Sequence, residues 1–188
     1  KYWSPFDFAR TQMDTNHITR IKWDTDLEDI RLVEVIDKAV ELKNTHASCM
    51  PDKLSVIKYR IKTPTIAKML NVWDRDFVCL QYWALKKDGS ILIVSQSTEH
   101  QRHPESRSTE ESCVRAETTC TMLIKKREKA DPNDEEEPNL FVEMAAWVKP
   151  NGWMPDQVVA WFKRRMAERI VFFSEECWQK ATTKNSGY

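Results

Sequence analysis

The sequence predicts an α+β domain in which several antiparallel strands are followed by one long C-terminal helix. Two short apolar segments flank the turn signal Asp88-Gly89, which accepts positive φ and marks a hairpin. After Pro155-Asp156, apolar residues recur at steps of three and four, as they do on one face of a helix. At ~100–200 residues per domain, the 188-residue chain fits a single domain over residues 1–188.

The N-terminal part is predicted to contain a helix followed by strands. Ser4-Pro5 supplies a capping hydroxyl and a proline at the first helical position, which predicts a short helix from Ser4 to Met13. A turn-rich segment then reaches Trp23-Asp24. Strands are expected at residues 27–36, where the alternation has one imperfection, at 40–42, and at 53–61, whose clearer apolar face holds Ile57, Tyr59 and Ile61.

Two further strands, at residues 77–85 and 91–97, form the predicted hairpin. Both faces of the first are largely apolar: one carries Phe77, Cys79, Trp83 and Leu85, and the other Val78, Leu80, Tyr82 and Ala84. A half-solvated antiparallel strand would keep one polar face. We therefore expect helices or a ligand to cover both sides of this strand.

The second half contains strands at residues 114–124 and 140–148 and then the long helix. A polar loop at His100–Ser112 precedes the first of these strands, and a charged connector at 125–139 follows it. The acidic run at 134–137 is typical of a solvated hairpin tip rather than of a metal site. The helix is expected to be ~35–40 Å long, with an apolar stripe made by Val158, Phe162, Met166, Ile170, Phe173 and Cys177.

Composition and charge exclude several classes of protein. The chain has 29 basic and 29 acidic residues, so there is no excess of positive charge to neutralise nucleic-acid phosphates. No apolar run approaches the ~18–20 residues of a membrane-spanning helix, and no secretory leader is recognisable. Five cysteines without paired spacing predict free thiols, a reducing compartment and hence a soluble cytosolic protein.

No motif for catalysis or metal binding emerges from the sequence. Three glycines in the whole chain exclude a Gly-x-Ser-x-Gly elbow and Gly-rich phosphate loops. His100 and His103 together with Cys113 and Cys120 match no structural-zinc spacing. A nucleophilic pair of Cys113 with His100 stays open, although nothing in the sequence orients the base. We therefore expect a protein that is not an enzyme and has no catalytic residues, metal or cofactor.

A set of motifs in a fixed order covers the chain from Ser4 to Lys180. They are Arg20-Ile21-Lys22-Trp23-Asp24, Arg75-Asp76-Phe77-Val78, the hairpin Asp88-Gly89-Ser90 with Ile93-Val94-Ser95-Gln96-Ser97-Thr98-Glu99-His100, Val114-Arg115-Ala116-Glu117, and Lys149-Pro150-Asn151-Gly152-Trp153-Met154-Pro155. Together they resemble the START domain, the lipid-transfer module related to steroidogenic acute regulatory protein. Each motif alone is weak, but the ordered set is specific.

The resemblance implies a helix-grip fold, in which a curved antiparallel sheet wraps around the long C-terminal helix and encloses a lipid tunnel. It also implies that a cytoplasmic monomer carries one lipid at a time and contacts membrane surfaces transiently. For lipid entry, the helix and the loop His100–Ser112 would move together; because this loop is polar, docking would rest on the helix ends. The family's leading helix and first strands have no counterpart before Ser4. A sheet without them would have an open edge, which soluble proteins normally avoid, so we expect an omitted stretch of sequence rather than a smaller fold.

The resemblance further implies which residues bind the lipid head group. In phosphatidylcholine carriers an Arg pairs with the phosphate through its planar fork of donors, and an Asp four residues later holds that Arg. Arg20 and Asp24 occupy these positions, although on spacing alone a surface salt bridge without a ligand fits equally well. Tyr59 and Phe77 fall at two of the aromatic positions that surround choline by cation–π contact.

Three other positions bear on the choice of lipid. Thr119 lies near a third aromatic position of the choline site but is not aromatic, and Thr121 falls where the family places a hydrogen-bond donor to the head group. Sterol carriers keep a buried Arg where this chain has Gln81. We therefore expect a phospholipid of the phosphatidylcholine type, ahead of ceramide and then a sterol.

The lid of the expected tunnel is the C-terminal helix, with side chains that would contact acyl chains: Trp161, Phe162, Met166, Ile170 and Phe173. An amphipathic helix of this pattern also fits ordinary core packing. A second functional hypothesis is a lipid-sensing regulatory domain of a larger protein, for example of a thioesterase type.

Overall fold

The structure, a computed structural model, describes residues 4–36, 53–103, 113–127 and 140–172. The elements in chain order are α1 (Pro5–Gln12), α2 (His17–Arg20), β1 (Leu27–Val35), β2 (Lys53–Ile61), α3 (Thr65–Lys68), β3 (Asp74–Leu85), β4 (Ile91–Ser97), β5 (Cys113–Arg115), β6 (Glu117–Lys126), β7 (Leu140–Lys149) and α4 (Asp156–Phe172). The predicted α+β class is confirmed.

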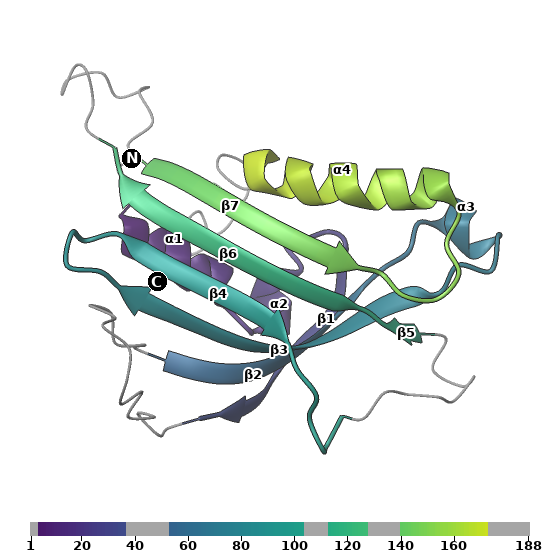
Figure 1. The fold of residues 1–188 in the computed structure, drawn as a ribbon, viewed down its shortest axis with the longest axis horizontal. Helices are drawn as coiled ribbons and strands as arrows, with labels where there is room; N and C mark the ends of the chain where they lie inside the picture. Colours follow the sequence, from purple (N-terminus) through teal and green to yellow (C-terminus); the bar gives the residue numbers. More distant parts are fainter. Residues whose placement is uncertain (1–3, 37–52, 104–112, 128–139, 173–188) are drawn as a thin grey trace.

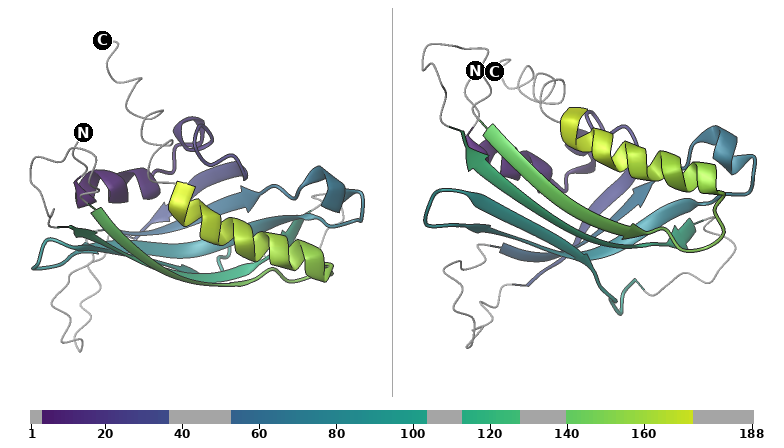
Figure 2. Two further views of the ribbon diagram at one scale, coloured as in Figure 1. Left: turned by 90° about the horizontal axis from the view of Figure 1, so that it is seen from above. Right: turned by 45° about the horizontal axis from the view of Figure 1, so that its top comes forward.

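The strands form one curved sheet in the order β1-β2-β3-β4-β6-β7, with neighbouring strands antiparallel throughout this path. The short β5 adds to the start of β3 in parallel. Helices α1 and α4 lie on the same face of the sheet, which is its concave side (Figures 1 and 2). The sheet is not closed: within the described residues, β1 pairs only with β2 and β7 only with β6.

The N-terminal helix begins as its sequence predicts. The Ser4 hydroxyl accepts a hydrogen bond from the backbone N–H of Asp7 at 3.0 Å, and Pro5 occupies the first turn. Phe8 and Ala9 are the buried residues of this helix, so its packing face is short. The helix therefore covers only one end of the concave face.

Several predicted elements differ in detail from the observed ones. The imperfection in the first strand is a pair of register shifts, one between Leu27 and Asp29 and one between Leu32 and Glu34. The strand predicted at 114–124 is divided at Ala116 into β5 and β6, which pair with different strands. The helices α2 and α3 have four residues each, too few for a helical period to be visible in sequence. The strand expected at 40–42 lies outside the described residues.

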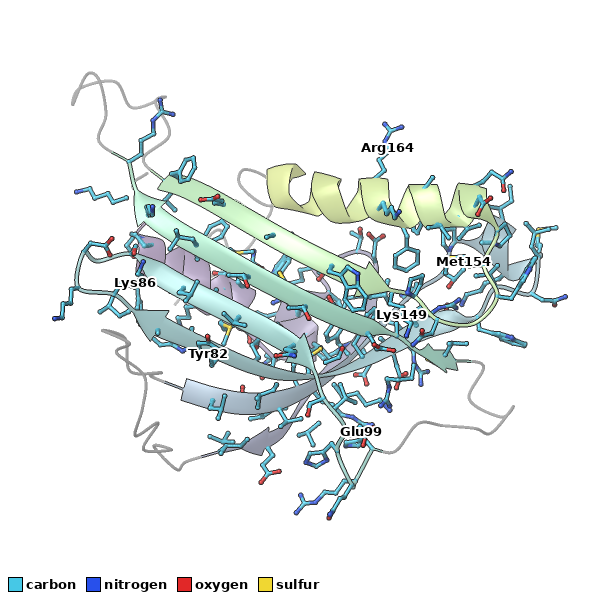
Figure 3. All side chains as sticks on the ribbon, viewed as in Figure 1. Tyr82, Lys86, Glu99, Lys149, Met154 and Arg164 are labelled. Atoms are coloured by element: carbon cyan, nitrogen blue, oxygen red, sulfur yellow. The ribbon has the colours of Figure 1, made fainter. Side chains whose placement is uncertain are left out.

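The concave face carries two separate apolar clusters. The α1 cluster joins that helix to β4 and β6 through Phe8, Ala9, Ile91, Ile93 and Ile124. The α4 cluster joins the start of that helix to β2, β3 and Ala116 through Ile57, Ile61, Phe77, Cys79, Ala116 and Phe162. The predicted inward face of β2 is thereby confirmed for Ile57 and Ile61. Lys163 and Arg164 are exposed on α4, and Arg164 points away from the strands (Figure 3).

On the outer face of the sheet, the segment that follows β4 covers the first half of β3. The His100 ring lies 3.0 Å from the Glu34 carboxylate of β1, so the segment after β4 crosses the outer face of β3 and β2. Val78 is buried, whereas Leu80 and Tyr82 are only half-buried. The expectation that helices or a ligand cover both sides of this strand is therefore wrong for the outer side, where a loop segment covers only the start of the strand.

A buried ionic cluster lies on the outer face of β3 near its start. Asp76 accepts two hydrogen bonds from Arg115, at 3.0 and 2.9 Å, and its carboxylate is 3.4 Å from Lys58 Nζ. Burial alone would raise the pKa of Asp76, but the hydrogen bonds and charge of Arg115 and the charge of Lys58 outweigh it and lower the pKa below 3.8. The carboxylate is therefore ionised in the folded protein at neutral pH.

The turn between β7 and α4 depends on two residues with positive φ, Asn151 at 50° and Gly152 at 62°. The Asn151 side-chain amide donates to the Arg115 carbonyl and to the Glu117 carboxylate, both at 3.1 Å. A Cβ at Gly152 would lie 3.3 and 3.4 Å from the two methyl groups of Val114. Glycine is therefore required here both by the backbone and by the close approach of β5.

We expect Gly152→Ala to lower the free energy of unfolding by about 1–2 kcal/mol, since the left-handed conformation and the contact with Val114 both oppose a side chain. Gly89→Ala is a matched control, because Gly89 has φ of 76° and nothing within 4 Å of an added Cβ. Chemical denaturation should show a larger loss for Gly152. Equal losses would mean that the contact with Val114 contributes nothing.

We expect Asp76→Asn to lower the free energy of unfolding at pH 7 by about 3 kcal/mol, because two largely buried cations lose their counter-ion. The folded pKa of Asp76 is lowered, so its stabilisation is present above pH 3.8 and is lost as the pH falls through the folded pKa. The gap between wild type and variant, measured by denaturation at several pH values, should shrink below pH 3.8. A gap independent of pH would contradict the ionic role.

Candidate functional site

A pocket of about 160 Å³ lies between the two apolar clusters. On one side it is lined by residues of the α1 cluster and its neighbours: Phe8, Met13, Ile93, Met122 and Val142. On the other side Ile57 and Tyr59 belong to the α4 cluster and its neighbours. The connection from α1 to β1 forms its roof, and the concave face of the sheet forms its floor. Most of the wall is therefore apolar.

One wall of the pocket carries a held arginine. The Arg20 Nε lies 3.5 Å from the Asp24 carboxylate, and the side chains are 14% and 2% exposed. The Trp23 ring stacks on the Arg20 guanidinium at 4.1 Å, and the carbonyls of Thr11 and Gln12 accept from Arg20 Nη1. These contacts fix an ion pair of Arg20 with Asp24 at the pocket wall, in surroundings that screen charge less than bulk water does.

The floor of the pocket contains a polar row that crosses three neighbouring strands. Gln81 on β3 is opposite Ser95 on β4, and Ser95 is opposite Cys120 on β6. All three line the pocket, as do Tyr59 and Thr118. An amphipathic molecule would find hydrogen-bonding groups along this row and apolar groups on either side of it.

The thiols near the floor have the chemistry of small apolar groups. Burial raises the pKa of Cys79, and burial together with Cys79 raises the pKa of Cys120. A thiol that stays protonated at neutral pH is a poor nucleophile. Burial also raises the pKa of Cys113 to about 11, and the ring of His100 contacts Glu34 on the outer face. In the described part of the chain, no three His, Cys, Asp or Glu side chains are grouped as metal ligands.

The structure brings four of the seven head-group residues predicted from sequence to one pocket: Arg20, Asp24, Tyr59 and Gln81. Phe77 is paired with Tyr59 on the neighbouring strand, with ring centroids 4.7 Å apart and planes 10° from parallel, and belongs to the α4 cluster. Phe77 therefore packs beside a residue of the pocket wall and does not line the pocket itself.

Thr119 and Thr121 are placed on the opposite face of the sheet. Along β6 the residues that line the pocket are Thr118, Cys120 and Met122, so their odd-numbered neighbours point outward. The head-group position implied for these two threonines is not supported by this register. Thr118 and Cys120 are the polar groups of β6 that reach the pocket, and strand alternation combined with the pairing of Ser95 to Cys120 would have identified them.

The lid residues are only partly described. Phe162 is buried in the α4 cluster, and Trp161 packs at its edge, with the two rings perpendicular at 5.4 Å. The backbone of α4 includes Met166 and Ile170, whose side chains lie outside the description, as does Phe173 entirely. The first turns of α4 thus pack against the sheet as the sequence predicts.

A curved antiparallel sheet that holds helices over a pocket with an arginine–aspartate pair in its wall defines a domain of the helix-grip type. The family model of the START domain matches residues 7–184, so the chain belongs to the START domain family. Among solved structures, human StAR-related lipid transfer protein 5 is similar, with a TM-score of 0.56 and 21% identity over 89% of this chain. The chain spans 65% of the length of that protein's chain. A search of curated proteins finds no match.

Two observations concern a possible contact with membranes. No described helix is long and apolar enough to cross one. Exposed apolar side chains gather at the end of the sheet where β3 begins, on the loop of residues 62–73 and on the turn before α4. The prediction that the last helix and the loop His100–Ser112 move together, with docking at the helix ends, stays a prediction, because residues 104–112 lie outside the described residues.

Proposed function

We propose that the protein binds one amphipathic lipid in this pocket and carries it between membrane surfaces. The observation that supports the proposal is the pocket itself, where a fixed arginine and a polar floor are combined with apolar walls. Membership of the START domain family supports a lipid ligand in general. The lipid is a phospholipid of the phosphatidylcholine type, with ceramide and sterol as the alternatives.

Arg20 is the residue that favours a phospholipid. A guanidinium donates two parallel charge-assisted hydrogen bonds to a phosphate, and Asp24 and Trp23 hold the Arg20 side chain in place for it. Tyr59 offers an aromatic face to a choline group, although the third aromatic of such a site is missing. Gln81 replaces the buried arginine of sterol carriers with a neutral amide, which argues against a sterol.

Carriage requires that the pocket enlarge. The pocket has a volume of about 160 Å³, below the ~300–1,000 Å³ typical of sites for drug-sized ligands. Each acyl CH₂ shielded from water contributes about 0.8 kcal/mol, which stabilises an expanded, lipid-filled state relative to a lipid in water. The bilayer offers the chains a similar environment, so exchange at a membrane can proceed in both directions.

The surface that meets the membrane is the apolar end formed by α3 and its loop. Ile66 and Met69 are 75% and 79% exposed, and Leu70 and Trp73 are about half exposed. The base of this loop is fixed, since the Asp74 carboxylate accepts from the Thr63 N–H at 2.7 Å and from Lys68 Nζ at 2.8 Å. Trp153, 66% exposed, lies in the turn that leads into α4. An apolar surface on a fixed base is suited to enter the head-group layer.

The proposal has further parts. The protein acts as a carrier and not as an enzyme, works as a monomer, and meets membranes peripherally from the cytoplasm. A lipid-sensing role within a longer, thioesterase-type protein is the second candidate. It shares the same pocket and would be recognised by lipid binding without net transfer between vesicles.

We expect Arg20→Ala to slow transfer of phosphatidylcholine between vesicles at least tenfold, equivalent to about 1.4 kcal/mol, because the phosphate loses its charged partner. Arg20→Lys should recover only part of the rate, since it keeps the charge and loses the fork. Arg31→Ala is the control, because Arg31 is exposed on β1 and does not line the pocket. Unfolding curves measured in parallel would separate a lost contact from a lost fold.

Unchanged transfer by a folded Arg20→Ala variant would exclude the phosphate contact. Native mass spectrometry of the purified protein then identifies the ligand class. One phosphorus-containing lipid per chain supports the phospholipid, whereas a ceramide or sterol adduct keeps the pocket and replaces the head-group assignment.

We expect the double variant Met69→Ser, Leu70→Ser to bind phosphatidylcholine vesicles at least tenfold more weakly, because two apolar side chains no longer leave water at the membrane. Leu85→Ser is the matched control: Leu85 is also about half exposed, but it lies beside the hairpin of Lys86, at the end of β3 far from Met154 (Figure 3). Flotation of the three proteins with vesicles measures the difference. An equal loss in the Leu85 control would contradict a directed membrane surface.

A further inference from the structure

Methionine is concentrated on one side of the pocket. Of the five methionines whose side chains the structure describes, three line the pocket: Met13, Met122 and Met144. Met122 on β6 is directly opposite Met144 on β7, and both belong to the concave face. Met13 caps the C-terminal end of α1, which packs over β4 and β6 (Figure 1). We call these three side chains, which come from three elements to one pocket, the methionine wall.

The other sides of the pocket are fixed by their own contacts. Towards the α4 cluster, the β-branched Ile57 is 3% exposed and the Tyr59 ring is stacked on Phe77. The polar row of the floor belongs to β3, β4 and β6, which are joined by main-chain hydrogen bonds. The Arg20 side chain is held by Asp24. The methionine wall is therefore the side that can yield when the pocket enlarges around an acyl chain.

Methionine is the apolar side chain that changes shape most readily. It is unbranched, has three rotatable bonds and carries a polarisable sulfur, so it fills irregular spaces and tolerates repacking. All three side chains of the methionine wall are half-buried, which leaves them room to change rotamer. A wall of this kind can stay in contact with a straight chain and with a bent chain, as flexible methionine-rich surfaces do in proteins that accept many ligands.

We propose that the methionine wall determines which acyl chains the pocket accepts, and that it makes straight saturated chains and bent cis-unsaturated chains bind equally well. The inference rests on the proposed function and adds the chain to it: Arg20 selects the head group, and the methionine wall leaves the shape of the chain unselected. Side chains branched at Cβ would discriminate in the same place, because their restricted rotamers offer one fixed surface.

Loading from mixed vesicles tests the inference. The vesicles contain equal amounts of dimyristoyl and dimyristoleoyl phosphatidylcholine, whose chains have the same length and differ by a cis double bond. After the protein is separated from the vesicles, native mass spectrometry measures the ratio of the two bound lipids. Wild type should load them within about twofold of each other, and the double variant Met122→Ile, Met144→Ile should favour the saturated lipid at least about fivefold.

Met154→Ile is the matched control. Met154 is also half-buried, but it packs against the α4 cluster in the turn that leads into α4 and does not line the pocket (Figure 3). The control should load the two lipids as wild type does. Equal loading by a folded double variant, the same shift in the control, or strong selection by wild type would overturn the inference. A wild-type protein that loads neither lipid would instead refute the proposed function.

Nuclear magnetic resonance of isotope-labelled methionine methyl groups tests the wall in the wild-type protein, so the inference stays falsifiable if the double variant does not fold. The methyl signals of Met13, Met122 and Met144 should differ between the complexes with the two lipids, because the side chains adopt different rotamers around a straight and a bent chain. The signal of Met154 should be the same in both complexes. Identical signals from the methionine wall in the two complexes would overturn the inference.

Discussion

The pairing register of the sheet is the constraint on which the site depends. Successive side chains of a strand point to opposite faces, so a shift of one residue exchanges the whole set that faces the pocket. On β6 the observed register directs Thr118, Cys120 and Met122 inward. The bulge between Leu27 and Asp29 adjusts β1 locally, so that Leu27 and Ile30 both reach the pocket although they are an odd number of positions apart. Every polar group of the floor is placed by this network of main-chain bonds.

The position of the pocket follows from where the apolar side chains stop. The α1 cluster fills one end of the concave face and the α4 cluster fills the other. Between them the inner face presents Gln81, Ser95 and Cys120. An apolar helix packed directly on these groups would bury them without hydrogen-bond partners, at a cost of about 1–3 kcal/mol each. The middle of the face is therefore poorly suited to become core and well suited to receive an amphipathic ligand.

Much of this arrangement could be predicted from the sequence, because long elements carry visible periods. The capped helix at Ser4, the strands of the Asp88-Gly89 hairpin and the C-terminal helix were all identified from local patterns. The side of the sheet to which Thr119 and Thr121 point could not be obtained in the same way. Both faces of β6 mix polar and apolar residues, and its register is set by pairing with β4 and β7. The four-residue helix α3 was missed for a related reason: it is stabilised by the closed base of its loop at Asp74 rather than by its own pattern.

The environment of Arg20 explains how a site for a charged head group can remain exchangeable. An isolated buried arginine would bind a phosphate tightly, because its own desolvation cost is already met in the folded protein and the phosphate would be its first counter-ion. Here Asp24 already neutralises Arg20, and the carbonyls of Thr11 and Gln12 accept from it. The net binding free energy of an arriving phosphate is therefore the energy of its contact with Arg20 less the energy of the Arg20 contacts that it weakens. On the proposed function, the acyl chains supply most of the stabilisation against water, and the arginine supplies selection among head groups. A bilayer offers the acyl chains the same stabilisation. The difference in free energy between a lipid in the pocket and a lipid in the bilayer is therefore small enough for the lipid to leave.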